Sequence, residues 1–183
     1  MGGIDKAFLT LEGKTLIERK LELLTSAGFS RIYIVTNKPE QYEQFSVTLV
    51  KDREQGFGPL MGLYSGLKAS TAESNLVTTV DTPFLGPALL EELTVPLPDV
   101  DARVAVWRGM TEPLLAVYKQ SCVPAIEASF PRRRIISFYD KVTVRYFPEA
   151  RIREIDPEGL SFFNINSWEE YEAAKEMAAS LVK

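Results

Sequence analysis

The sequence predicts an α/β fold, a single domain built around a mostly parallel sheet. Three observations support this class: short β-branched runs alternate with helical stretches, the chain has 183 residues, and 45% of them are apolar with 25% charged. Strands that alternate with helices of roughly ten residues are typical of βαβ units, whose crossovers make neighbouring strands parallel. The length suits one domain, and the composition supports a full hydrophobic core. We therefore expect residues 1–183 to form one domain.

The first half of the chain alternates regularly. A helix is expected over 16–26, because leucines recur at helical spacing and Ala27-Gly28 ends the pattern. Gly58-Pro59 opens another helix, since proline is well placed in a first turn. This helix is expected over 60–69, a further helix over 89–93, and strands over 31–36, 47–50 and 75–80.

The second half is less regular but still patterned. Strands over 102–107 and 114–118 flank a turn at Arg108-Gly109, and a third strand is expected over 142–147. The last helix has a clear start, because Ser167 and Glu170 have the spacing of a capping box. No repeat or linker divides the chain.

The composition excludes several classes of chemistry. The chain has no histidine and one cysteine, Cys122, and its formal net charge is −4. These counts exclude Ser–His–Asp and Cys–His catalysis, histidine-ligated zinc, cysteine-ligated iron–sulfur clusters and an intrachain disulfide. Catalysis would depend on carboxylates, lysine, arginine, hydroxyls, amides and a hard metal ion. An acidic chain without basic blocks also indicates that nucleic acid is not a partner.

We expect no targeting signal at the N-terminus. Asp5 and Lys6 stand where a signal peptide would place its apolar stretch, and Lys6 occupies the position that a myristoylation motif reserves for serine or threonine. No window approaches the roughly 18 apolar residues of a membrane helix. We expect a cytoplasmic protein that does not bind a membrane.

Polar residues follow three of the predicted strands. They are Asn37, Asp52 and Asp81, one after each of the strands expected in the first half. Ligands of open parallel sheets bind beyond the carboxyl ends of the strands, so these side chains are expected to converge on one pocket. Ordinary turn or helix-cap roles for such residues stay open as the alternative.

A glycine-rich segment, 56–62, is a second candidate. Glycines before a helix start let a ligand approach the backbone, and the first amides of the helix favour an anion. An ordinary loop before a tightly packed helix is the alternative. Lys6, just past Gly2 and Gly3, is placed to neutralise phosphate charge. A solvated terminal lysine is the alternative reading of that residue.

Two further clusters could contact a ligand. Asn164 and Asn166 flank Ile165, so an extended strand would present both amides on one side. The run over 132–134 is three arginines, which would suit an anionic substrate. Turn-forming asparagines and a solvated charged surface are the respective alternatives.

Taken in order, these motifs resemble the molybdenum cofactor guanylyltransferases, nucleotidyltransferases with a doubly wound α/β fold of the nucleotide-diphospho-sugar transferase, Rossmann-like type. The family's glycine-rich loop has the form LAGGxSxRMGxDK, and residues 1–6 match only its tail. The agreement continues over most of the chain, through residues 11–16, Gly58-Pro59-Leu60-Met61-Gly62, Asp81-Thr82-Pro83, Thr111-Glu112-Pro113 and Phe163-Asn164-Ile165-Asn166.

The resemblance implies transfer of GMP from GTP to the phosphate of molybdopterin or the molybdenum cofactor, with release of pyrophosphate. It assigns Lys6 to the phosphates and Asp81 to Mg²⁺, with both as the catalytic residues. It also implies molybdoenzymes or other cofactor-biosynthesis proteins as partners. The residues that it implies for GTP are Lys6, Asn37, Asp52, Gly58, Pro59, Leu60 and Asp81, and those for the pterin side are Asn164 and Asn166.

The sequence departs from the family at its start, where the first strand and the first half of the glycine-rich loop are missing. We expect residues upstream of Met1 to supply them, because the rest patterns as a complete domain. Alternatives are a CTP-using or sugar-phosphate nucleotidyltransferase of the same fold, and a truncated, non-catalytic protein that binds or delivers the pterin cofactor.

Overall fold

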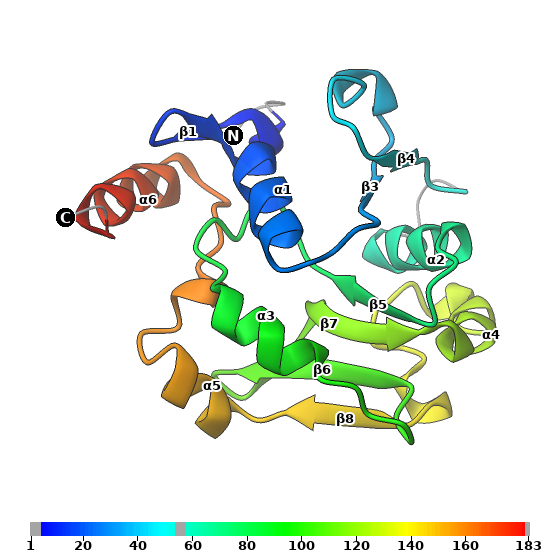
Figure 1. Ribbon diagram of the computed structural model, residues 1–183. Helices are drawn as coiled ribbons and strands as arrows, with labels where there is room; N and C mark the ends of the chain where they lie inside the picture. The colour runs from blue at the N-terminus through cyan, green and yellow to red at the C-terminus, as the bar shows by residue number, and fades with distance from the viewer. Residues whose placement is uncertain (1–4, 54–57, 182–183) are drawn as a thin grey trace. The chain divides into compact units, whose positions relative to one another are not determined.

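The structure is a computed structural model that describes residues 5–53 and 58–181 (Figure 1). The chain forms two compact units. The first comprises Met1–Ser30, Thr79–Glu92 and Ala150–Lys183, and the second comprises Arg31–Thr78 and Leu93–Glu149. Two helices, α3 (Pro87–Thr94) and α5 (Glu149–Ile155), run across the divisions between these segments. The expectation that residues 1–183 form one domain stays a prediction.

In the first unit, the described chain starts with the short helix η1 (Lys6–Phe8) and the antiparallel strands β1 (Thr10–Leu11) and β2 (Lys14–Thr15). Near the C-terminus come the short helix η6 (Leu160–Phe162) and α6 (Trp168–Leu181). The two ends of the sequence share one core, made of Leu9, Leu11, Leu16, Ile165 and Ala174.

Helix α1 (Leu16–Ser26) has the bounds that the sequence predicts. The Thr15 hydroxyl accepts from the Glu18 amide at 3.3 Å, and the Glu18 carboxylate accepts from the Thr15 amide at 2.7 Å. This reciprocal capping box satisfies amides that the first helical turn would leave unpaired. The helix ends where Gly28 takes a φ of +87°, a conformation that glycine adopts without strain.

In the second unit, β3 (Tyr33–Val35) and β4 (Thr48–Val50) form a parallel pair. Helix α2 (Pro59–Ala69) lies beside this pair in Figure 1 and packs on it through its glycines. A Cβ added at Gly66 would lie 3.2 Å from Cγ2 of Val35, so the absence of a side chain there permits the close approach. Strand β3 is shorter than the 31–36 run that the sequence predicts.

The same unit holds a four-stranded sheet in the order β5–β7–β6–β8. Strands β6 (Ala102–Trp107) and β7 (Met110–Lys119) form the predicted hairpin, with positive φ at both Arg108 and Gly109. The remaining strands are β5 (Ser74–Val77), antiparallel to β7, and β8 (Val144–Phe147), parallel to β6.

The α/β class is confirmed, but the expectation of a mostly parallel sheet is not met, because this sheet is mixed. The reason is the two-residue turn, since a hairpin necessarily reverses chain direction.

The core of the second unit lies between α2, this sheet and the segment 122–138. Its largest members are fully buried, among them Tyr118, Phe138, Leu60 and Met61. The Tyr118 and Tyr139 hydroxyls lie 2.6 Å apart, and the Tyr118 hydroxyl also donates to the carbonyl of Pro113 at 2.9 Å. The hydroxyls that this core buries therefore have partners.

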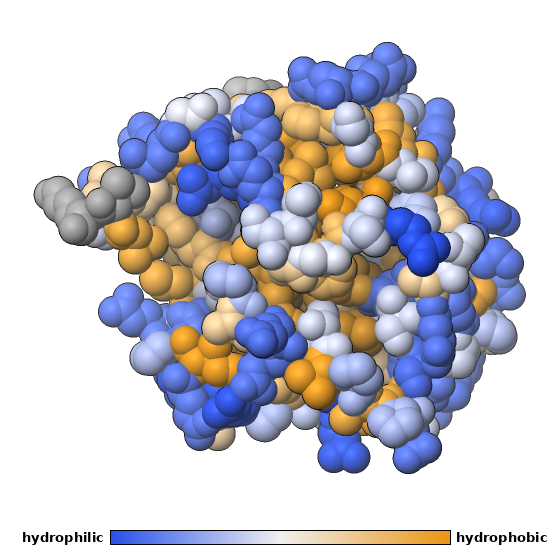
Figure 2. Space-filling model, in the orientation of Figure 1, coloured by the Kyte–Doolittle hydropathy of each residue, from blue (hydrophilic) through white to orange (hydrophobic). Residues whose placement is uncertain are grey.

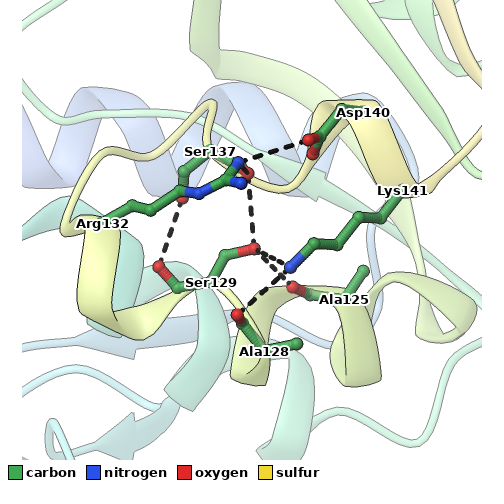
Figure 3. Close-up of polar contacts among 7 residues, drawn as sticks. All are labelled: Ala125, Ala128, Ser129, Arg132, Ser137, Asp140 and Lys141. Atoms are coloured by element: carbon green, nitrogen blue, oxygen red, sulfur yellow. Dashed lines mark hydrogen bonds and ion pairs between the residues drawn. The ribbon is translucent and has the colours of Figure 1, made fainter.

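Arg132, the first residue of the arginine run over 132–134, lies in this unit and makes structural contacts (Figure 3). Arg132 donates to the carbonyl of Ser137 at 3.1 Å and lies 3.3 Å from the Asp140 carboxylate. Lys141 donates to the Ser129 hydroxyl at 3.0 Å and to the Ala128 carbonyl at 3.1 Å. These bonds close the loop between residues 128 and 141, and an anion-binding role for the arginine run stays a prediction.

Two other expected strands differ. Strand β5 ends at Val77 rather than at Val80, and residues 163–166 form no strand, although Ile165 is buried between the exposed Asn164 and Asn166. The face drawn in Figure 2 mixes hydrophilic and apolar residues. Among the described residues, no helix is long and apolar enough to cross a membrane.

Candidate functional site

Lys6 lies at the centre of a polar cluster in the first unit. Its Nζ donates to Oδ1 of Asn166 at 2.7 Å and lies 3.9 Å from Oδ2 of Asp81. Three residues that the sequence separates by up to 160 positions are thereby brought together. The Lys6 side chain is 31% exposed and that of Asp81 25%, so the pair can meet a ligand while remaining partly shielded from water.

Asp81 lies on a turn that follows β5. Its Oδ1 is buried and has no hydrogen-bond partner among the residues that the structure describes. Its carbonyl accepts from the Ile165 amide at 2.9 Å, which ties this turn to the segment carrying Asn166. A buried carboxylate oxygen without a donor is unfavourable, and a cation would satisfy it.

Lys20, which sequence reasoning missed, supports this turn from α1. Its Nζ donates to the carbonyl of Thr82 at 2.9 Å and to the Thr82 hydroxyl at 3.0 Å. Burial lowers the pKa of Lys20 to about 7, against the opposing effect of the Asp81 charge. The signal was in the sequence, because Lys20 lies between Leu16 and Leu24 at i, i+4 spacing on the buried face of α1.

In the second unit, Asn37 and Asp52 follow β3 and β4 and lie together. Nδ2 of Asn37 donates to Oδ2 of Asp52 at 3.0 Å. Oδ1 of Asp52 is buried and has no hydrogen-bond partner among the described residues, and a Cβ at Gly62 would lie 3.9 Å from it. The parallel pairing of β3 with β4 explains why two strand-end side chains meet.

The predicted glycine-rich segment is described only in part. Gly58 precedes α2 with a φ of +59°, and Pro59 is the first residue of that helix. The Leu60 side chain is fully buried in the core, which leaves only its backbone for a ligand. Gly56 and Phe57 lie outside the described residues, as do Gly2, Gly3 and Ile4.

Asn164 and Glu112, which belong to the motifs of the sequence, lie in neither of the two polar clusters described above. Asn164 is exposed, and its Nδ2 donates to the Phe162 carbonyl at 3.4 Å. Glu112 lies in β7, and burial raises the pKa of its carboxyl. The structure therefore brings Asn166, but not Asn164, into contact with Lys6.

The donor set is suited to magnesium rather than to a softer metal. No group of three acidic or cysteine side chains able to hold a metal occurs within residues 5–53 and 58–181. Mg²⁺ is commonly held by one or two carboxylates together with substrate phosphates and water. The unpartnered Oδ1 of Asp81, next to a lysine that can take phosphate charge, fits that pattern.

A comparison with protein families decides the relationship. The profile described as "MobA-like NTP transferase domain" matches residues 1–144, which is well over half of the chain. The chain belongs to the MobA-like NTP transferase family. It is therefore a nucleotidyltransferase, as the motifs indicate, and the resemblance stated from the sequence is confirmed.

Individual relatives agree with this family. A protein of Desulfosudis oleivorans named "Molybdenum cofactor guanylyltransferase" is 34% identical over 177 residues, covering 95% of this chain and 87% of the relative. A Methanosarcina mazei protein named "Probable molybdenum cofactor guanylyltransferase" is also 34% identical, covering 94% of this chain and 83% of the relative. This chain thus matches most of the length of both relatives.

Solved structures show the same fold. Molybdopterin-guanine dinucleotide biosynthesis protein A from Archaeoglobus fulgidus superposes with a TM-score of 0.81 at 28% identity, covering 97% of this chain and 92% of that one. A cytidylyltransferase for 2-C-methyl-D-erythritol 4-phosphate from Thermus thermophilus gives 0.71 at 16% identity, covering 95% and 94%. At 16% identity, the likeness to the cytidylyltransferase shows a shared fold and nothing about the activity of this chain.

Proposed function

We propose that this protein transfers GMP from GTP to the phosphate of molybdopterin or the molybdenum cofactor and releases pyrophosphate. The observation that carries the proposal is the cluster of Lys6, Asp81 and Asn166, with its unpartnered buried carboxylate oxygen. The names of the relatives supply the substrates, and the cluster supplies a place for phosphate charge.

The reaction needs no general base. A phosphate monoester is already an oxyanion near neutral pH, so its oxygen attacks the α-phosphorus of GTP directly. The bond from that phosphorus to the bridging oxygen of the β-phosphate breaks, and pyrophosphate leaves. Phosphoryl-type transfer depends on positioning and charge neutralisation, which a chain without histidine can provide.

Lys6 is assigned to the phosphates. Its ammonium lies beside Asn166 and Asp81 and is 31% exposed, so it is held in place and still open to a ligand. A fixed cation stabilises charge that develops in the transition state without the reorganisation that water would require. Lys6 therefore contributes to the rate as well as to binding.

Asp81 would hold Mg²⁺ through its unpartnered oxygen. When bound, the metal ion would neutralise triphosphate charge. The Asp81 main chain, anchored by the Ile165 amide, keeps the carboxylate in position before substrate arrives. Preorganisation of this kind lowers the free energy needed to order the site.

Asn37 and Asp52 are assigned to the nucleotide in the second unit, together with the backbone of Gly58, Pro59 and Leu60. Asp52 offers a buried carboxylate oxygen without a partner among the described residues. A carboxylate accepts hydrogen bonds, and the guanine base presents amino and imino donors. The hydrogen bond from Asn37 fixes the orientation of the carboxylate.

Asn164 and Asn166 are assigned to the pterin substrate. Both are exposed on either side of the buried Ile165, which anchors this segment in the core. Molybdoenzymes or other proteins of cofactor biosynthesis are the proposed recipients of the product.

The assay combines the protein with α-labelled GTP, Mg²⁺ and molybdopterin, and measures label in the dinucleotide together with released pyrophosphate. Asp81→Ala is expected to lower turnover on the order of 10³-fold or more, because the site loses its metal-binding carboxylate. Asp140→Ala is the matched control, since this exposed aspartate pairs with Arg132 at the surface of the second unit. The control should retain wild-type turnover.

Two results would contradict the proposal. Near-normal turnover of Asp81→Ala would remove Asp81 from the metal role. Binding of GTP and pterin without pyrophosphate release by the wild type would instead favour the non-catalytic binding protein.

A further inference from the structure

The turn that carries Asp81 is held by a hydrogen-bond chain that begins on a different element. Lys20 donates from α1 to the Thr82 carbonyl at 2.9 Å and to the Thr82 hydroxyl at 3.0 Å. That hydroxyl in turn donates to the Thr79 carbonyl at 3.2 Å. The Thr82 side chain thus joins Thr79 to Thr82 across Asp81, and Lys20 anchors the Thr82 side chain.

Within the described residues, the buried Lys20 amine meets the turn that carries Asp81, through its hydrogen bonds and through the attraction of the Asp81 charge. Lys20 is 6% exposed and lies on the same helix face as Leu16 and Leu24, where an apolar residue would pack without loss of hydration. In the described part of the chain, both hydrogen bonds of the Lys20 amine go to Thr82, the residue directly after Asp81. The contact with the Thr82 turn therefore explains why a lysine, and not an apolar residue, occupies this buried position.

The helix gives this contact rigidity. The capping box of Thr15 and Glu18 fixes the start of α1 one turn before Lys20. On the opposite side, the Asp81 carbonyl accepts from the Ile165 amide at 2.9 Å. The Asp81 main chain is consequently held from two directions, while Oδ1 of its carboxylate stays without a partner in the described part of the chain.

We propose that Lys20 is a positioning residue: from the buried face of α1, it fixes the turn at Thr82 and so places the Asp81 carboxylate for the reaction. The role of Asp81 in this inference rests on the proposed function. The contacts by which Lys20 holds the turn do not depend on that function. Lys20 does not touch substrate. It acts through Thr82, and a misplacement of a catalytic group by roughly 1 Å can lower a rate about 10²-fold.

The first test separates positioning from general stability by kinetics. Lys20→Met keeps the length and removes the donors, and it is expected to lower kcat about 10- to 100-fold with little change in the KM for GTP. In an Asp81→Asn background, the same change should lower the rate no further, because both substitutions remove one function. A multiplicative further loss in that background would overturn the proposal.

Lys175→Met is the matched control. Lys175 lies on α6 in the same compact unit, where its exposed side chain pairs with Glu172, three residues earlier, and its ammonium lies 5.2 Å from the centroid of the Tyr171 ring. This variant should keep the wild-type kcat and KM.

The second test does not depend on activity. Hydrogen exchange of a peptide covering residues 79–83 is compared among the wild type, Lys20→Met and Lys175→Met at a temperature where circular dichroism shows all three folded. Faster exchange only in Lys20→Met is expected, and equal exchange in all three would overturn the proposal. If the wild type transfers no nucleotide, the proposed function fails, and this measurement still decides whether Lys20 holds the turn.

Thr82→Val provides the test should Lys20→Met not fold. It removes the hydroxyl and with it one of the two acceptors of Lys20 and the bond to Thr79. A fall in kcat at unchanged KM, with faster exchange at residues 79–83, is expected. Wild-type behaviour of Thr82→Val in both measurements would overturn the proposal.

Discussion

At the scale of single residues, what distinguishes this protein is where it leaves polar groups without partners. Oδ1 of Asp52 and Oδ1 of Asp81 are both buried without a hydrogen-bond partner among the described residues. Buried polar groups in folded proteins are nearly always satisfied, and each exception requires an explanation. Both of these atoms belong to residues that the sequence placed at strand ends as ligand candidates, and a bound ligand is our explanation.

Lys6→Ala should lower the transfer rate on the order of 10²-fold, less than the loss at Asp81, because one charge-stabilising group is removed. The measurement is kcat/KM at saturating Mg²⁺. Lys14→Ala is the control, since the Lys14 ammonium pairs with Glu22 at 2.8 Å on the surface. An unchanged rate in Lys6→Ala would show that Lys6 is only a surface cation.

At the scale of elements, helix starts supply the framework for the sites. The segment carrying Asn166 leads directly into α6, and the Glu170 carboxylate accepts from the amides of Asn166 at 2.6 Å and Ser167 at 2.8 Å. The Glu170 amide donates to the Ser167 hydroxyl at 3.1 Å. This capping box both starts the helix and orients the residue that contacts Lys6.

Ser167→Ala should lower the free energy of unfolding by about 1 kcal/mol, because an N-cap hydroxyl is lost. Chemical denaturation measures the change. Ser180→Ala, near the other end of α6, is the control; its hydroxyl donates to the Met177 carbonyl, and we expect a change within about 0.5 kcal/mol. Equal effects of the two substitutions would contradict the importance of the cap.

At the scale of the whole molecule, charge and fold agree with a small-molecule enzyme. The formal net charge is −4, so the overall charge does not attract anions, and local cations placed by the fold have to do so. Of the lysines and arginines discussed above, Lys6 faces the candidate site, whereas Lys20, Arg132 and Lys141 hold turns and loops together.

Nucleotide selectivity is tested on the whole protein by thermal shift. GTP with Mg²⁺ should raise Tm more than CTP with Mg²⁺, since a ligand at about 100 times its Kd stabilises the folded state by about 2.7 kcal/mol. ATP and UTP complete the panel, and EDTA should reduce the shift caused by GTP. A larger shift with CTP would replace the guanylyl assignment by a cytidylyl one.

The sequence by itself determined the family, the α/β class, the bounds of α1 and the starts of α2 and α6. These features depend on local signals, such as capping residues, a proline in the first turn and hydrophobic period, which act within a few residues. The motifs also singled out Lys6, Asp81 and Asn166, though their roles stay predictions.

Only the tertiary structure decided which of these residues meet. It paired Lys6 with Asn166, 160 positions away, and placed a buried lysine, Lys20, behind Thr82, 62 positions away. Contacts between residues 60 or more positions apart depend on how elements pack. A single sequence carries no local signal for that packing, because it is set by long-range burial rather than by neighbouring residues.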